Sequence, residues 1–281
     1  MKNEEFFILH TMSPIGIFDS GYGGLSILEK IRRILPEYDY IYWGDNARAP
    51  YGTRSFDIVY QFTLEAVKQL FDMDCRLVIL ACNTASAKAL RTIQQNDLPQ
   101  INPSGRVLGV IRPTIENIGA ITQTRHVGLV GTPGTISSKS YPIEIAKLFP
   151  DIVVEEEACP MWVPLVENQE YDKPGADYFI QKHLNNILDR DPLIDTLILG
   201  CTHYPFLEPK IRKYLPSNIQ IVSQGHYVAE SLKDYLHRHP EMNAVCSKNG
   251  ICEYYTTESP EKFSETASIF MQENVQAKQL R

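Results

Sequence analysis

The sequence contains no apolar run long enough to cross a bilayer: its longest apolar stretches, such as residues 77–82 (LVILAC), fall far short of a spanning helix. It also has no excess of positive charge, since 27 Lys and Arg stand against 34 Asp and Glu, giving a net charge of −7. A surface of this sign repels phosphate backbones, so we expect neither membrane insertion nor nucleic-acid binding. Residues 1–12 include Glu4 and Glu5 and do not resemble a secretory signal, so we expect a cytoplasmic protein.

Cysteine occurs six times, but never in a spacing typical of a metal site. There is no Cys-x-x-Cys pair and no Cys/His quartet with zinc-finger spacing, so no metal is expected. A chain of this length in a reducing compartment is not expected to form disulfides. The glycine-rich segment at residues 21–24 lacks Gly-x-Gly-x-x-Gly spacing, which argues against a dinucleotide site.

Short apolar strands alternate with helical patterns along the whole chain. This alternation predicts an α/β fold with parallel sheets covered on both faces, and the number of units favours two α/β domains. We expect strands at 15–18, 40–43, 77–81, 107–111, 127–131, 152–154, 196–199, 219–222 and 252–256. We expect helices at 25–35, 55–71, 84–95, 115–121, from about 138, and at 174–189, 207–214, 226–237 and 261–271. In such folds ligands bind beyond the carboxyl ends of the strands.

Two of these strand ends carry the same local pattern. Residues 77–84 (LVILACNT) and 196–203 (TLILGCTH) each place a cysteine, Cys82 and Cys201, one small residue beyond an apolar strand. A helix that begins at that point would lower the pKa of the thiol. Two such thiols on opposite sides of one cleft suit the inversion of a stereocentre, with one as base and the other as acid. The pattern therefore suggests a racemase or an epimerase.

Polar residues near the strand ends fit this chemistry. Asp19 ends the first strand and is suited either to orienting a thiol or substrate ammonium group or to capping a helix. The backbone N–H groups of the following glycine-rich turn suit a carboxylate. His203 lies two residues beyond Cys201 and is placed to influence the protonation of that thiol, whereas Glu167 carries a weaker signal by itself.

Several longer motifs resemble those of the glutamate racemases, within the wider aspartate/glutamate racemase family. The similarity extends over about residues 14–270. The motifs that carry it are residues 14–25 (PIGIFDSGYGGL), 44–52 (GDNARAPYG), 81–86 (ACNTAS), 131–135 (GTPGT), 158–160 (ACP), 163–167 (VPLVE) and 200–205 (GCTHYP). The resemblance implies a cofactor-independent amino-acid racemase with two similar domains related by pseudo-twofold symmetry and a site between them. It also implies a role in supplying D-glutamate for peptidoglycan synthesis.

The same resemblance assigns roles to individual residues. Cys82 would be the base toward D-glutamate and Cys201 the base toward L-glutamate, with Asp19, His203 and Glu167 assisting them. The substrate-binding residues that it implies are Asp19, Ser20, Tyr51, Gly52, Asn83, Thr84, Thr202 and His203. A histidine at position 203 favours glutamate over aspartate as the substrate.

The resemblance also implies an organisation. The first domain would comprise residues 13–108 and 219–281, the second domain residues 109–218, and residues 1–12 an N-terminal tail. Family members are commonly dimers, so a homodimer is expected. Two departures stand out: Met161 and Trp162 replace smaller aliphatic residues, which would alter the cleft floor, and residues 223–225 (SQG) lack an expected Asp.

Three other classes of protein remain open on sequence grounds. A cysteine hydrolase would use one of the thiols as a nucleophile with His203 and Asp19, but it has no need of the second thiol. A non-enzymatic amino-acid-binding protein gives no reason for paired thiols. A pyridoxal-phosphate racemase would require a Schiff-base lysine, which the sequence neither identifies nor excludes.

Overall fold

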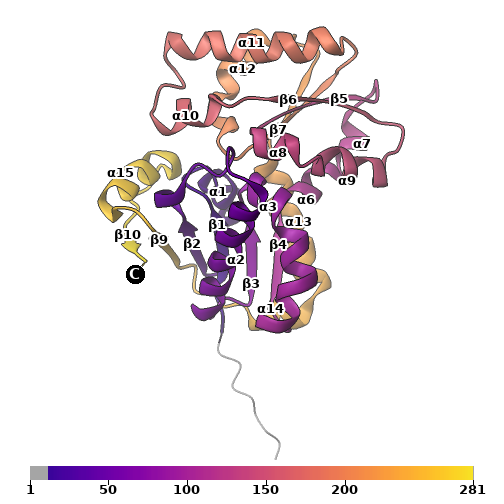
Figure 1. Cartoon of the computed structure of the whole chain (residues 1–281). Coiled ribbons are helices and arrows are strands. Elements are labelled where there is room, and N and C mark those ends of the chain that lie inside the picture. The colour runs from indigo at the N-terminus through magenta and orange to yellow at the C-terminus, as the bar shows by residue number, and fades with distance from the viewer. Residues whose placement is uncertain (1–11, 281) are drawn as a thin grey trace, which may run out of the picture.

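In a computed structural model, which describes residues 12–280, the chain forms two parallel β-sheets (Figure 1). The first sheet has the strand order β10-β9-β2-β1-β3-β4 and the second has the order β6-β5-β7-β8. The strands of the first sheet are β1 (Ile15–Asp19), β2 (Tyr40–Gly44), β3 (Leu77–Leu80), β4 (Arg106–Gly109), β9 (Cys252–Thr256) and β10 (Ala277–Gln279). Those of the second are β5 (His126–Gly131), β6 (Val153–Ala158), β7 (Thr196–Gly200) and β8 (Gln220–Val222).

Helices connect these strands and cover both sheets (Figure 1). The helices around the first sheet are α1 (Leu25–Ile34), η1 (Asn46–Arg48), α2 (Phe56–Asp72), α3 (Asn83–Lys88), α4 (Leu90–Thr92), the π-helix η2 (Ile93–Asp97), α5 (Leu98–Ile101), α13 (Gln224–Arg238), α14 (Pro240–Val245) and α15 (Pro260–Met271). Those of the intervening chain are α6 (Ile111–Ile115), α7 (Ile118–Ile121), α8 (Pro133–Ser137), α9 (Ser140–Leu148), α10 (Trp162–Glu167), α11 (Pro174–Arg190), η3 (Tyr204–Leu207) and α12 (Glu208–Tyr214).

Burial on both faces explains why the strands are almost wholly apolar. Alternate residues of one strand belong to different core clusters: Ile15 and Ile17 of β1 pack on one side of the first sheet and Phe18 on the other. The second sheet divides in the same way, with Leu197 and Ile198 of β7 in separate clusters. Strands covered on both faces have no polar alternation, which is the pattern the sequence shows. The molecule therefore consists of two α/β domains, as predicted.

The chain crosses between the two sheets twice, after β4 and after β8. The prediction placed residues from 219 onward in the first domain. The second crossing comes slightly later in the chain, because β8 pairs with β7 in the second sheet. The expected strand at 107–111 ends at Gly109, and a helix begins at Ile111. The expected helix at 84–95 is broken into α3, α4 and the π-helix η2. Residues 1–11 of the predicted tail lie outside the described part of the chain.

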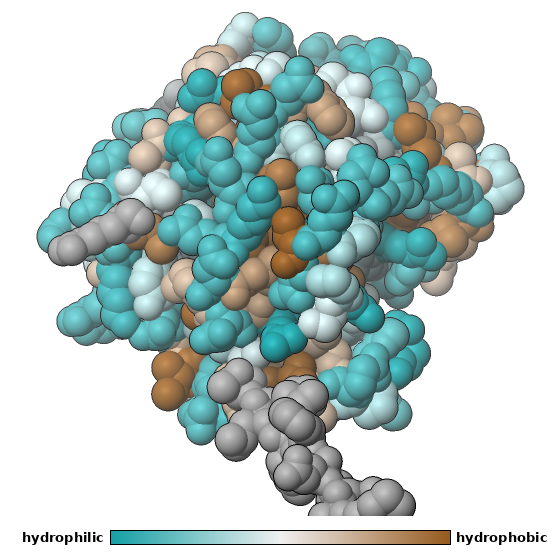
Figure 2. Space-filling view, turned by 60° about the horizontal axis from the view of Figure 1, so that its bottom comes forward, coloured by the Kyte–Doolittle hydropathy of each residue, from teal (hydrophilic) through white to brown (hydrophobic). Residues whose placement is uncertain are grey.

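The surface mixes hydrophilic and hydrophobic residues (Figure 2). Figure 2 shows a face on which hydrophobic residues form small groups among hydrophilic ones. No helix within residues 12–280 combines the length and apolarity needed to cross a membrane.

Candidate active site

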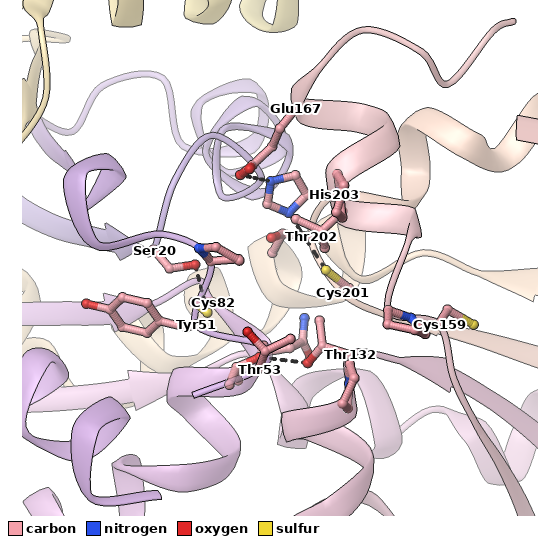
Figure 3. A pocket seen from close by; sticks show the side chains of 18 residues that line it. Ser20, Tyr51, Thr53, Cys82, Thr132, Cys159, Glu167, Cys201, Thr202 and His203 are labelled. Carbon is pink, nitrogen blue, oxygen red and sulfur yellow. Dashed lines mark hydrogen bonds and ion pairs between the residues drawn. The ribbon is translucent and has the colours of Figure 1, made fainter. Parts of the chain in front are cut away.

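The two strand-end thiols lie in one cleft between the domains. Cys82 follows β3 and immediately precedes α3, while Cys201 follows β7. Each of the two residues is 6% exposed, and both line a cavity of about 90 Å³. Figure 3 shows the two sulfur atoms on different domains at the edge of this cavity. Two thiols from separate domains can therefore approach one small molecule.

Cys201 lies beside a histidine that is linked to a carboxylate. Its Sγ is 3.7 Å from His203 Nδ1, and His203 Nε2 is 3.1 Å from Glu167 Oε1 (Figure 3). Burial by itself lowers the pKa of His203, but the interactions with Cys201 and Glu167 outweigh it and raise the pKa well above its usual range. A protonated imidazole beside Cys201 stabilises a thiolate there.

Cys82 has the opposite environment. Burial raises the pKa of its thiol to about 12, and the negative charge of Asp19 adds to the effect. The Ser20 hydroxyl, 3.4 Å from Sγ, and the backbone N–H of Ala85 oppose this only in part. The expected lowering of the thiol pKa by a helix N-terminus is therefore wrong for Cys82, because desolvation outweighs the first turn of the short helix α3. The raised pKa favours the protonated form of the Cys82 thiol.

Asp19 lies behind the cavity and not in its wall. Its carboxylate accepts a hydrogen bond from the backbone N–H of Gly21 at 2.9 Å and one from the Thr202 hydroxyl at 3.5 Å. The side chain is fully buried, and this burial raises its pKa despite the opposing charge of His203. Asp19 thus orients Thr202 and the turn after β1.

Most of the residues expected to bind substrate line the cavity. Ser20, Tyr51, Gly52, Asn83, Thr84, Thr202 and His203 all do so. The hydroxyl of Tyr51 is directed away from the cavity and donates to the Asp45 carboxylate, so only the ring and backbone of Tyr51 are available there (Figure 3).

Contacts between the loop before α2 and the helix α8 close one side of the cleft. The backbone N–H of Gly134 donates to the carbonyl of Gly52 at 2.7 Å, which joins the loop before α2 to α8. The hydroxyls of Thr84 and Thr132 are 2.9 Å apart, and that of Thr135 is 3.1 Å from Thr132. No role was predicted for Thr132 or Thr135, although both lie in the 131–135 motif that carries part of the resemblance.

The side-chain positions also settle the expectation about the cleft floor. Trp162 does not line the cavity, because its ring is buried in the second domain, with its centroid 4.8 Å from that of the Tyr204 ring. Cys159 lines the cavity, but its sulfur points away from it and lies 3.7 Å from the carbonyl oxygen of Glu157 (Figure 3). Within residues 12–280, no group of three or more His, Cys, Asp or Glu side chains is placed to hold a metal ion.

Comparison with known proteins shows which family the chain belongs to. The family model of Asp/Glu/Hydantoin racemases matches residues 15–232. The chain belongs to this racemase family. It is therefore an isomerase that acts as an amino-acid racemase. It is 39% identical over 274 residues to a glutamate racemase of Ruegeria sp. (strain TM1040), covering 93% of this chain and 97% of the relative.

Solved structures of racemases have the same fold. A glutamate racemase of Bacillus anthracis matches with a TM-score of 0.87 and 33% identity, covering 96% of this chain and 97% of the other. A glutamate racemase of Francisella tularensis, solved in complex with D-glutamate, matches with a TM-score of 0.83 and 32% identity, covering 96% of both chains. Membership of the racemase family disfavours the hydrolase and the non-enzymatic binding protein that the sequence left open.

Proposed function

We propose that this racemase interconverts L-glutamate and D-glutamate by transferring protons between the substrate and two thiols. The observation that carries the proposal is the pair Cys82 and Cys201, which line one cavity from different domains. In one direction the Cys201 thiolate removes the α-proton of L-glutamate, and the Cys82 thiol then donates a proton to the opposite face. The reverse reaction exchanges the roles of the two thiols.

The electrostatics of the ligand-free site suit the first of these directions. Cys82 holds its proton because its pKa is raised to about 12, and the His203 cation stabilises a thiolate at Cys201. The resting enzyme is then ready to remove a proton from L-glutamate. After one turnover Cys201 carries the proton and Cys82 is ionised, which is the form that acts on D-glutamate.

Roles for the surrounding groups follow from their positions. Ser20, Gly52, Asn83, Thr84, Thr202 and His203 surround the space between the thiols and bind the two carboxylates of glutamate through hydroxyl, amide and backbone donors. Tyr51 contributes through its backbone. Asp19 acts from behind the cavity wall, where it orients Thr202 and the turn after β1. Glu167 assists through His203. No metal or cofactor takes part.

The wider setting is part of the same proposal. The enzyme supplies D-glutamate for peptidoglycan synthesis in the cytoplasm and works as a homodimer, the assembly that the resemblance implies. The domain division follows the sheets: the first domain holds the strands before residue 110 and those after residue 250, and the second holds β5 to β8. Sedimentation velocity tests whether the protein is a dimer. A monomer at micromolar concentration would contradict this part of the proposal.

Circular dichroism of each glutamate enantiomer, incubated with dialysed and chelator-treated protein, tests the activity. We expect both signals to decay to zero without added metal or cofactor. Alanine serves as the control substrate and should react far more slowly, because polar groups meant for the side-chain carboxylate are left unpaired. Restoration of activity only by zinc or by pyridoxal phosphate, or comparable rates on alanine, would contradict the proposal.

A further inference from the structure

A buried hydrogen-bond network joins the residue after Cys82 to both crossings between the domains. Its members are Asn83 of α3, Thr114 of α6, Tyr141 of α9 and Gln224, the first residue of α13. All four are at most 3% exposed. Three of them are separated from Gln224 by between 83 and 141 positions in the sequence, so only the tertiary fold brings them together.

The amides of Asn83 and Gln224 pair reciprocally. Asn83 Nδ2 donates to Gln224 Oε1, and Gln224 Nε2 donates to Asn83 Oδ1 at 3.1 Å. The hydroxyl of Tyr141 lies 2.7 Å from both Asn83 Oδ1 and Gln224 Nε2. Burial raises the pKa of Tyr141, so its hydroxyl keeps the proton that it donates to Asn83.

This network determines which atoms of the Asn83 amide are free. Its oxygen already accepts from two donors, Tyr141 and Gln224. Its nitrogen has two N–H groups, and only one of them has a partner within residues 12–280, namely Gln224 Oε1. Because Asn83 lines the cavity, the group that it has left for a ligand there is an N–H donor.

The surroundings of Gln224 also explain why an amide and not a carboxylate occupies this position. Its Nε2 lies near four acceptors: Asn83 Oδ1, Tyr141 Oη, Thr114 Oγ1 at 3.1 Å and the carbonyl oxygen of Val110 at 3.4 Å. A carboxylate oxygen in the same place would face this group without protons to donate, at a cost typical of an unsatisfied buried polar group. The Gln224 side chain is therefore matched to the network.

We propose that Gln224 is a positioning residue for substrate binding: it fixes the Asn83 amide so that the free N–H of Nδ2 donates to a carboxylate of the bound amino acid. This inference rests on the proposed function, with glutamate as the dicarboxylate. Without Gln224, the Asn83 amide loses its reciprocal partner and can rotate to present its oxygen, which repels a carboxylate. Gln224 acts only through Asn83 and does not touch the substrate.

The test compares Gln224→Met, which keeps the length of the side chain but removes its hydrogen bonds, with Tyr141→Phe, which removes a single hydroxyl. Binding of DL-glutamate, already at equilibrium for the reaction, is measured by calorimetry, and KM and kcat are measured on each enantiomer. We expect Gln224→Met to raise Kd and KM about tenfold, while kcat falls less than KM rises, because a charge-assisted hydrogen bond is misaligned. Tyr141→Phe should raise Kd about threefold.

The matched control is Tyr38→Phe, which removes the hydroxyl that a buried tyrosine donates to Asn243 at 2.8 Å; Tyr38 precedes the amino end of β2 and does not line the cavity. It should bind and turn over glutamate as the wild type does. Wild-type Kd in both network variants, or a loss of kcat at unchanged Kd, would overturn the positioning role. If Gln224→Met does not fold, as judged by circular dichroism, Tyr141→Phe decides. A wild-type enzyme that does not interconvert glutamate instead refutes the proposed function, whatever the variants do.

Discussion

At the scale of single residues, His203 is defined by its two neighbours. Its imidazole lies between the carboxylate of Glu167 and the thiol of Cys201, so its charge depends on one and supports the other. The interaction with Glu167 is one of the causes that raise the pKa of His203. Removing that negative charge must therefore lower the pKa of His203 and weaken the stabilisation of a Cys201 thiolate.

This dependence predicts the pH profile of Glu167→Gln. Exchange of the α-hydrogen of L-glutamate near neutral pH should fall about tenfold or less, because a smaller fraction of His203 is protonated to stabilise the Cys201 thiolate. This deficit should shrink at alkaline pH, where a thiol ionises without a neighbouring cation. The measurement is hydrogen exchange from L-glutamate as a function of pH. A ratio to the wild-type rate that does not change with pH would show that Glu167 does not act through His203.

Asp195 illustrates a residue whose role is stability. Although burial opposes ionisation, hydrogen bonds from the Thr122 hydroxyl at 2.7 Å and from the backbone N–H groups of Gln123 and Thr124 lower the pKa of Asp195 to about 2. The folded-state pKa lies below the ordinary aspartate pKa of 3.8. Its stabilising contribution is thus present above about pH 4 and is lost as the pH falls through about 2.

We therefore expect Asp195→Asn to lower the free energy of unfolding by about 1 to 2 kcal/mol at pH 7, a value reduced for partial solvent exposure. The difference from the wild type should shrink between about pH 4 and pH 2. Urea unfolding at a series of pH values measures it. A difference that stays constant down to pH 2 would contradict the assignment.

Residue types near strand ends were predictable, but their environments were not. Cys82 and Cys201 could be identified from two matching segments of sequence. The raised pKa of Cys82 could not, because it depends on burial and on the charge of Asp19, which lies on another strand. The pairing of Asn83 with Gln224 depends on packing across 141 positions and leaves no local signal.

At the scale of elements, the contact between the loop before α2 and helix α8 closes the cleft. The carbonyl of Gly52 accepts from the N–H of Gly134. A β-carbon added at Gly52 would lie 2.7 Å from Cβ of Thr132, closer than such atoms approach in proteins. The absence of a side chain at Gly52 is thus required for the loop to reach the second domain.

Gly52→Ala should push this loop away from α8 and misplace groups on one wall of the cavity. We expect kcat/KM to fall about ten- to a hundredfold, a range typical of displacements of about 1 Å in an active site. Steady-state racemisation measures this effect. The matched control is Gly175→Ala in α11, where an added β-carbon meets nothing within 4 Å and activity should be unchanged. Full activity of Gly52→Ala would mean that this contact is not needed.

Sequence patterns predict best the elements whose hydrophobic residues recur with a clear helical or strand period. Helix α2, expected at 55–71, spans Phe56–Asp72, and Ser55 caps it by accepting from the N–H of Ile58. The short helices α10 and α14 were not predicted, because six residues carry too little periodicity. The expected strand at 107–111 extended through Ile111 because apolar runs do not distinguish a strand from the start of a buried helix.

At the scale of the whole molecule, a substrate that touches both domains must stabilise the folded chain. The cavity is lined by residues of both domains, so bound glutamate adds contacts that the unfolded chain cannot make. At a concentration one hundred times Kd, the free energy of unfolding should rise by about 2.7 kcal/mol. Thermal unfolding with and without glutamate measures this, with alanine as the control. Equal shifts from both amino acids would contradict recognition of a second carboxylate.

The central claim is that each thiol serves one face of the substrate, and hydrogen exchange in deuterated water tests it most directly. Near neutral pH a serine is hardly ionised, so each Cys→Ser variant keeps only one effective base. Both variants should lose racemisation. Cys82→Ser should still exchange the α-hydrogen of L-glutamate through Cys201, and Cys201→Ser that of D-glutamate through Cys82. Equal loss of exchange from both enantiomers in both variants, or full racemisation by either one, would contradict the account.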